Sequence, residues 1–169
     1  MKAAIIGYSG SGKSTLAGIL GARYGAQVLH LDRVQFLPGW KVRAARDKQR
    51  IVREFLDTHD SWVIDGNYSS LYFDRRMEEA DLIVLLLFGR LACLARVLLR
   101  YRKYRDRTRP DMAEGCREKV DPEFVSWVLW RGRSGKARDR YRQVRQRYAG
   151  KVVVLKDQRQ LDRFIGSLP

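Results

Sequence analysis

Apolar residues gather in five short runs along the chain, separated by longer amphipathic stretches. The runs cover residues 3 to 6, 28 to 31, 62 to 65, 82 to 88 and 152 to 155. They lack a regular alternation of polar and apolar positions, which is typical of strands buried on both faces of a parallel sheet. The pattern therefore predicts five buried strands.

Helical periodicity fills the stretches between these runs. Apolar residues recur at spacings of three and four in four groups: Leu16, Ile19 and Leu20; Ile51, Val52, Phe55 and Leu56; Leu91, Leu94, Ala95 and Leu98; and Ala137, Tyr141, Val144 and Tyr148. Strands alternating with helices predict an α/β fold, a doubly wound parallel sheet with helices on both faces. In such folds ligands bind beyond the carboxyl ends of the strands.

The length and composition fit one domain spanning 1–169, because 169 residues with 45% hydrophobic content can bury a full core. We find no leader-like segment and no apolar run near the roughly 18 residues that span a bilayer, so we expect a cytoplasmic protein without a membrane partner. The cysteines, Cys93 and Cys116, and the histidines, His30 and His59, form no metal or disulfide framework in sequence. We interpret all four as structural or incidental.

A glycine-rich segment at 7–15 joins the first predicted strand to the first predicted helix. It has the spacing Gly-x-x-x-x-Gly-Lys-Ser of a phosphate-binding loop, or P-loop. Glycine tolerates the backbone angles that turn successive N–H groups toward phosphates, and the following helix directs its positive end at the same anion. The residues expected to bind ATP are Gly7, Ser9, Gly10, Ser11, Gly12, Lys13, Ser14 and Thr15. A plain glycine-serine turn is the alternative.

Two carboxylates directly follow predicted strands and so belong at the same sheet edge as the P-loop. We expect Asp65, with the Ser14 hydroxyl, to hold Mg²⁺, and Asp32 to accept the proton of a substrate hydroxyl. The alternatives are a turn residue for Asp65 and a helix cap or surface ion pair for Asp32.

The fourth apolar run carries no acidic residue at its carboxyl end. Motor and helicase ATPases commonly place an acidic pair after such a strand to polarise an attacking water, and a GTPase needs an Asn-Lys-x-Asp stretch that this chain lacks. Phosphotransfer to a small molecule needs neither, because the substrate itself is the nucleophile. The absences favour a small phosphotransferase.

Positive charge is concentrated in the second half of the chain. The net charge is +15, and residues 90 to 147 alone hold 18 Lys or Arg against 7 Asp or Glu. Glycine and proline interrupt the arginine-rich stretches, so we expect a helical, arginine-rich lid at about 101–138 that closes over bound phosphates. Arg133, Arg138 and Arg142 are the expected catalytic contacts.

The same basic stretch, with Trp127 and Trp130, suggests nucleic-acid binding as a competing interpretation. However, Phe124, Val128 and Arg131 follow helical spacing, so we expect the aromatic residues nearby to face the core. A basic surface also binds nucleic acids non-specifically, without a dedicated site.

Six segments, at 5–14, 29–33, 36–40, 62–68, 107–112 and 156–159, resemble the bacterial DNA topology modulation proteins, also called FlaR-related. More distantly, the chain is similar to the adenylate-kinase and shikimate-kinase group of P-loop proteins. That similarity implies a three-layer fold with a five-stranded parallel sheet in the order 2-3-1-4-5, and Arg159 near the adenine. Asp65-Gly66 matches those kinases, but Asn67-Tyr68 stands where they carry proline and arginine, which argues against a nucleoside monophosphate substrate.

Together these features predict an ATP- and Mg²⁺-dependent phosphotransferase acting on a small molecule. The expected substrate residues are Asp32, Arg33, Trp40 and Asn67, and Lys13 is expected to be catalytic as well as phosphate-binding. The alternative is a nucleotide-regulated DNA-binding protein without kinase activity.

Overall fold

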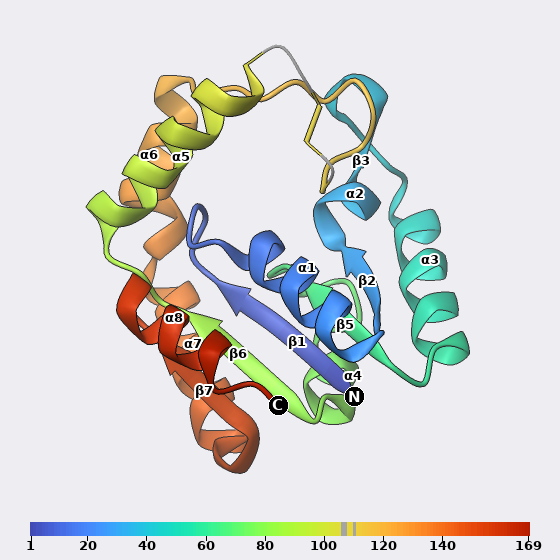
Figure 1. The fold of residues 1–169 in the computed structure, drawn as a ribbon. Helices are drawn as coiled ribbons and strands as arrows, with labels where there is room; N and C mark the ends of the chain where they lie inside the picture. The colour runs from blue at the N-terminus through green and yellow to red at the C-terminus, as the bar shows by residue number, and fades with distance from the viewer. Residues whose placement is uncertain (106–107, 110) are drawn as a thin grey trace.

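A five-stranded parallel sheet forms the centre of the molecule (Figure 1). The computed structural model describes residues 1–105, 108–109 and 111–169. The strands of the sheet are β1 (Lys2–Gly7), β2 (Gln27–His30), β5 (Trp62–Asp65), β6 (Leu82–Leu86) and β7 (Val152–Leu155). All neighbouring pairs run parallel, in the order β2-β5-β1-β6-β7.

A short antiparallel hairpin changes the strand numbering from the expected one. It consists of β3 (Phe36–Leu37) and β4 (Lys41–Val42), which the apolar pattern did not predict. With the two hairpin strands included in the numbering, the strand order of the sheet is β2-β5-β1-β6-β7 and not the stated 2-3-1-4-5. Among the parallel strands alone, counted along the chain, the second lies beside the third, the third beside the first, the first beside the fourth and the fourth beside the fifth.

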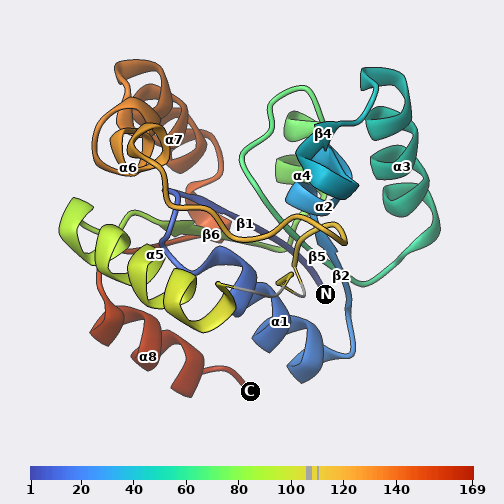
Figure 2. The same ribbon diagram turned by 90° about the horizontal axis from the view of Figure 1, so that it is seen from above.

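Helices cover both faces of the sheet, as the view from above makes plain (Figure 2). One face packs against α1 (Lys13–Tyr24), α5 (Arg90–Tyr104), α6 (Pro122–Leu129) and α8 (Gln158–Gly166). The other packs against α2 (Leu31–Gln35), α3 (Ala45–Thr58), α4 (Phe73–Glu79) and α7 (Gly135–Arg147). The buried strand β1 serves both, because Ala3 and Ile5 belong to the first core and Ala4 and Ile6 to the second.

The arginine-rich segment expected to form a helical lid is only partly helical. Its described residues include the end of α5, an irregular stretch at 111–121, α6, a 3₁₀ turn at Arg131–Arg133 and the start of α7. The irregular stretch packs on the hairpin, since Trp40 Nε1 donates to the Arg117 carbonyl at 3.1 Å and Cys116 Sγ contacts the Leu37 carbonyl at 3.4 Å. Within the predicted lid, Asp106, Arg107 and Pro110 lie outside the described residues.

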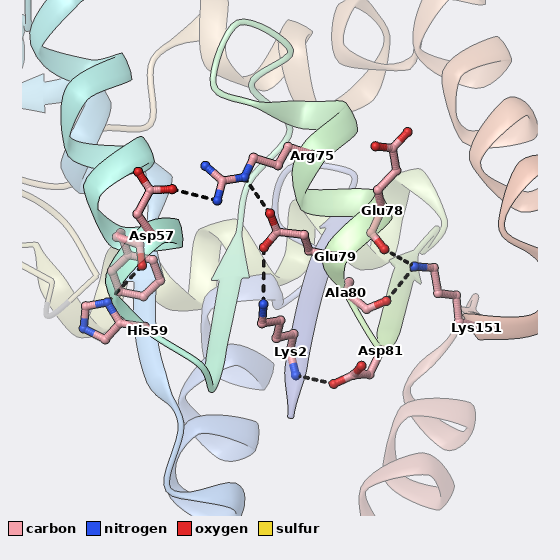
Figure 3. A network of polar contacts seen from close by, with 10 residues as sticks. Lys2, Asp57, His59, Arg75, Glu78, Glu79, Ala80, Asp81 and Lys151 are labelled. Atoms are coloured by element: carbon pink, nitrogen blue, oxygen red, sulfur yellow. Dashed lines mark hydrogen bonds and ion pairs between the residues drawn. The ribbon is translucent and has the colours of Figure 1, made fainter.

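Polar contacts join the elements at the amino ends of the strands (Figure 3). Lys2 Nζ pairs with Glu79 at 3.3 Å, and Arg75 pairs with both Glu79 at 2.5 Å and Asp57 at 2.7 Å. Lys151 donates to the carbonyls of α4's last turn and Ala80, each at 2.7 Å. This end is structural, and the opposite end of the sheet holds the candidate site.

No helix in the described part of the chain is both long and apolar enough to cross a membrane.

Candidate functional site

The β1–α1 loop (residues 8–12) leaves the sheet at its central strand and leads into α1. Two flanking glycines allow its shape. Gly7 has φ of +146°, and a Cβ there would lie 2.2 Å from the Leu86 carbonyl oxygen. Gly12 has φ of +94°, a left-handed conformation that side chains disfavour. The loop therefore lies tightly against β6 at the carboxyl edge of the sheet.

Lys13 folds back over this loop. Its Nζ donates to the Tyr8 carbonyl at 3.0 Å, so the ammonium group stands on the loop rather than in open solvent. Burial lowers the pKa of Lys13, although the carboxylates of Asp32 and Asp65 partly oppose the shift. A bound phosphate would give this ammonium group a negatively charged hydrogen-bond partner.

Ser14 and Asp65 meet although they are 51 positions apart in the chain. The Ser14 hydroxyl donates to Asp65 Oδ2 at 2.8 Å, and His30 Nδ1 lies 2.6 Å from Asp65 Oδ1. Burial alone would lower the pKa of His30, but the hydrogen bond and charge of Asp65 outweigh it and raise the pKa. The histidine that we interpreted as incidental therefore belongs to the site, where the register pairs it with Asp65 on the adjacent strand.

The Ser14–Asp65 pair suits Mg²⁺ chemically. Mg²⁺ prefers oxygen ligands and usually keeps waters and substrate phosphate oxygens alongside one or two protein ligands. The described residues contain no group of three or more His, Cys, Asp or Glu side chains that could hold a metal by themselves. A hydroxyl and a carboxylate beside the loop fit a cation that reaches the site with a nucleotide.

Asn67 has a different task from the predicted substrate contact. Its Nδ2 donates to the Gly7 carbonyl at 2.7 Å and its Oδ1 accepts from the Gly7 amide at 3.0 Å. Both ends of the side-chain amide are therefore occupied by the backbone at the start of the loop. Asn67 positions the loop, which corrects its assignment as a substrate residue.

Asp32 lies beside Tyr68 at the edge of a large cavity. The Tyr68 hydroxyl donates to Asp32 Oδ1 at 2.6 Å, and burial together with the Asp32 charge raises the pKa of that phenol, so it stays protonated. Arg33, the other predicted acceptor residue, is exposed on α2 and does not line this cavity. The helical turn from Leu31 to Gln35 sends these adjacent side chains in different directions, which corrects the expectation for Arg33.

Of the three predicted lid arginines, Arg133 reaches the loop. Its guanidinium lies 3.9 Å from the centre of the Tyr8 ring, while Nε donates to the Val128 carbonyl at 3.0 Å. Arg138 and Arg142 lie on the exposed side of α7, and Arg142 pairs with Asp139 at 3.3 Å. The helix turns the two away because Tyr141 and Val144 are its buried residues, so their assignment as phosphate contacts is corrected.

Two further arginines, which sequence reasoning did not select, contact the site. Arg140 Nη1 donates to the Asn67 carbonyl at 3.3 Å. Arg96 Nη1 donates to the Ser11 carbonyl at 2.7 Å, and its guanidinium lies 4.2 Å from the centre of the Phe88 ring. Arg96 stands one helical turn after Cys93, a buried position on α5, and that spacing is the signal that could have indicated it.

The remaining predicted nucleotide residues divide into two groups. Ser11 is buried and its hydroxyl donates to the Tyr8 carbonyl at 2.7 Å, so it shapes the loop. Thr15 and Arg159 are exposed, on α1 and α8 respectively. Gln158, next to Arg159, accepts from Arg96 Nη2, which links the start of α8 to the loop region.

A cavity of about 530 Å³ adjoins the loop, and we call it the loop-side cavity. Ser9 of the loop and Asp32 both line it, and so does Trp40, whose role as a substrate residue stays a prediction. The walls come from the hairpin, the irregular stretch 111–121, α5 and α6. Its size is that of pockets that hold small ligands.

Trp127 of α6 and Trp130, which directly follows that helix, were expected to face the core, but they do not. Trp127 is 48% exposed and Trp130 is 60% exposed, whereas Val128 between them is buried. Val128 is the one buried residue of this eight-residue helix, which packs beside α5.

Comparison with known proteins supports the fold alone. No protein-family model matches the chain, and no curated protein matches it. A crystal structure of TT1252 from Thermus thermophilus is similar over 100% of this chain and 98% of that chain, with a TM-score of 0.54 and 16% sequence identity. The chain shares with that protein an α/β fold built on a parallel sheet.

Proposed function

We propose that this protein is an ATP- and Mg²⁺-dependent phosphotransferase that acts on a small molecule. One observation carries the proposal: the β1–α1 loop, with Lys13 folded over it and Ser14 bonded to Asp65 at 2.8 Å, adjoins the loop-side cavity in which Asp32 lies. A phosphate-binding loop and a separate cavity sharing Ser9 suit two substrates that meet.

Each residue has a distinct role in this proposal. The loop amides and Lys13 bind the phosphates, and Ser14 with Asp65 holds Mg²⁺. Bound Mg²⁺ would neutralise phosphate charge. Arg133 and Arg140 bring positive charge to the same region from the α6–α7 segment, where it can stabilise the charge of the transferred group.

Asp32 acts on the acceptor. One of its oxygens accepts from Tyr68 at 2.6 Å, which holds the carboxylate in the wall of the cavity that Ser9 also lines. The acceptor hydroxyl gives its proton to Asp32 as its oxygen bonds to the γ-phosphorus. The bond between that phosphorus and the bridging oxygen breaks, and ADP leaves with the electron pair.

Calorimetry of ATP binding to Lys13→Ala tests the nucleotide half of the proposal. We expect affinity to fall by about 10- to 100-fold, the loss of a hydrogen bond to a charged group. Lys2→Ala, at the opposite end of the sheet, is the matched control and should bind ATP like the unmodified protein. Equal affinity of Lys13→Ala and Lys2→Ala would contradict the placement of the phosphates.

A second candidate is a nucleotide-regulated DNA-binding protein, in line with the resemblance to DNA topology modulation proteins. The exposure of Trp127 and Trp130 favours it, because exposed aromatic rings beside arginines can stack on unpaired bases. DNA binding that survives near-physiological salt and changes with ATP would support this candidate. Binding that disappears there would reflect only the net charge of +15.

A further inference from the structure

The loop-side cavity has strongly aromatic walls. Phe36 and Trp40 from the hairpin form one part, with ring centres 5.2 Å apart and planes inclined at 69°. Phe124 and Trp127 of α6 line it from another element, and Tyr68 stands beside Asp32. Rings arranged around a cavity of about 530 Å³ favour a ligand with a flat ring system that can stack on them.

The charges that line this cavity balance, although the chain as a whole carries +15. The cationic side chains are Arg100, Arg109, Lys119 and Arg131. The anionic ones are Asp32, Glu118, Asp121 and Glu123. Among the described residues, the lining therefore has no net charge at neutral pH, in contrast to the +15 of the whole chain. These residues offer no general attraction for an anionic ligand.

The two most enclosed arginines are engaged by one carboxylate. Arg100 Nη2 lies 2.6 Å from Glu118 Oε1, and Arg109 Nε lies 2.7 Å from Glu118 Oε2. The Glu118 side chain is only 4% exposed, so water screens these pairs little. Arg109 is also 3.1 Å from Asp111. A phosphate on the acceptor would have to compete with Glu118 for these guanidinium groups.

Asp32 is a further residue of the cavity that can select between a hydroxyl-bearing ligand and an anionic one. Among the residues that the structure describes, Tyr68 is the one hydrogen-bond donor to its carboxylate. The second oxygen can accept from a hydroxyl group of a molecule in the cavity. A carboxylate at the reacting end favours a hydroxyl acceptor and disfavours an anionic one, because like charges repel.

We propose that the acceptor is a molecule of nucleoside type: a flat heterocycle that stacks among Trp40, Phe124 and Trp127, joined to a hydroxyl-bearing group at Asp32, with no phosphate of its own. This inference rests on the proposed phosphotransferase function, which it deepens by assigning the acceptor class. The hydroxyl proton passes to Asp32 and the hydroxyl oxygen receives the γ-phosphoryl group of ATP.

Tryptophan fluorescence tests the acceptor class without requiring ATP. Adenosine and uridine are titrated into the protein alongside their monophosphates. We expect each nucleoside to change the fluorescence and to bind at least about tenfold more tightly than its monophosphate, a difference of about 1.4 kcal/mol. Nucleoside affinity should not change when salt rises from about 0.05 to 0.3 M, because no charge pairing is involved.

Substitutions locate the binding and separate it from the nucleotide loop. Trp40→Phe and Trp127→Phe should each remove part of the fluorescence change, whereas Trp130→Phe, which lies outside the cavity lining, should keep it in full. Glu118→Gln frees two guanidinium groups and should shift the preference toward the monophosphate by about tenfold. Glu118 is buried, so a second variant is needed that retains the fold. Glu123→Gln is that variant, because it frees Arg131 at the exposed rim. It should shift the preference toward the monophosphate as well, but less strongly.

Monophosphates that bind as tightly as nucleosides would overturn the proposal, as would a nucleoside-induced fluorescence change that is undiminished in both Trp40→Phe and Trp127→Phe. Absence of nucleoside binding would overturn it too. Failure here leaves ATP binding by Lys13 and its loop unaffected. Equal ATP affinity of Lys13→Ala and Lys2→Ala in the separate calorimetric test would instead contradict the phosphotransferase function itself.

Discussion

Asn67 holds both backbone groups of Gly7 at once. The side-chain amide donates to the Gly7 carbonyl at 2.7 Å and accepts from the Gly7 amide at 3.0 Å, although 60 positions separate the two residues. The pair ties the chain just after β5 to the last residue of β1. It thereby anchors the chain at the residue that immediately precedes the β1–α1 loop.

Replacing Asn67 should destabilise the fold and disturb the loop. Asn67→Ala leaves both Gly7 groups without their partner, so the free energy of unfolding should fall by roughly 1–3 kcal/mol. Urea denaturation measures this. Gln49→Ala removes an exposed hydrogen bond of 3.4 Å to Ser70 and should change stability by less than about 0.5 kcal/mol. Equal effects of the two substitutions would contradict the anchoring role.

Ser14→Ala should weaken the dependence of ATP binding on Mg²⁺. The hydroxyl stands 2.8 Å from Asp65, and together they are the proposed metal ligands. Losing one of them should raise the Mg²⁺ concentration needed for half-maximal ATP binding by about 10-fold or more. Titrations of Mg²⁺ at constant ATP measure the shift. The exposed Thr58 hydroxyl on α3 offers the control Thr58→Ala, whose titration should superimpose on that of the unmodified protein.

Lys13→Met should weaken ATP binding, as Lys13→Ala does, yet raise the melting temperature by a few degrees. Burial lowers the pKa of Lys13 from 10.5, so the folded protein bears a cost for the charged amine that methionine avoids. Between the lowered pKa and 10.5, the unfolded chain binds the proton more readily, so the unmodified protein gains stability as pH rises.

The advantage of Lys13→Met should therefore shrink as the pH rises from below the lowered pKa of Lys13 toward 10.5. Thermal denaturation across this pH range measures it, with Lys2→Met as a control that removes a cation at the other end of the sheet. An advantage that grew with pH would contradict the direction of the pKa shift.

The arginines of the α6–α7 segment should differ in their effect on turnover. Arg133→Ala should reduce ADP production with an acceptor by about 100-fold, since it removes a cation held beside Tyr8. Arg140→Ala should have a smaller effect in the same direction, because its guanidinium contacts Asn67 at the edge of the site. Arg138→Ala and Arg142→Ala should stay within about twofold. A larger loss in either of these would require α7 to rotate during the reaction.

Two neighbouring arginines on α4 should have opposite importance for stability. The Arg76 side chain is buried and donates to the carbonyls of Gly66, Tyr68 and Leu71, and burial lowers its pKa to about 10. Arg76→Met should cost about 3–5 kcal/mol of unfolding free energy, since it strips three carbonyls of their donor.

Arg75→Met provides the comparison for Arg76. Arg75 forms ion pairs with Asp57 and Glu79 at the surface, and its side chain is 34% exposed (Figure 3). Its loss should cost less than about 1 kcal/mol. Chemical denaturation of both variants decides whether the loop after β5 depends on the buried guanidinium. A small effect of Arg76→Met would mean that water replaces it.

The regularly patterned elements could be predicted because local patterns determine them. The five apolar runs correspond to β1, β2, β5, β6 and β7, and the four helical groups correspond to α1, α3, α5 and α7. The hairpin β3–β4 escaped prediction because its strands are two residues long, too short to show alternation. The helices α2 and α4, of five and seven residues, are likewise too short to show a helical repeat of apolar residues.

Parts of the candidate site were also predictable. Asp65 lies beside Ser14, and Asp32 and Trp40 line a cavity next to the loop, because the carboxyl ends of parallel strands share one edge. His30 was missed since its role comes from register: β2 ends one residue earlier than its apolar run, and His30 then pairs across with Asp65. Register between strands has no signal in a single strand's sequence.

The sequence by itself determined which residues form the sheet, where the glycine-rich loop stands between strand and helix, and that acidic residues follow two strands. These features depend on contacts between near neighbours in the chain. Only the tertiary structure decided that Asn67 holds Gly7, that Arg133 and Arg140 rather than Arg138 and Arg142 face the site, and that Glu118 occupies the cavity arginines. Those outcomes depend on how helices and loops distant in sequence pack together, since packing alone selects which side of each helix faces the site and which charges are paired.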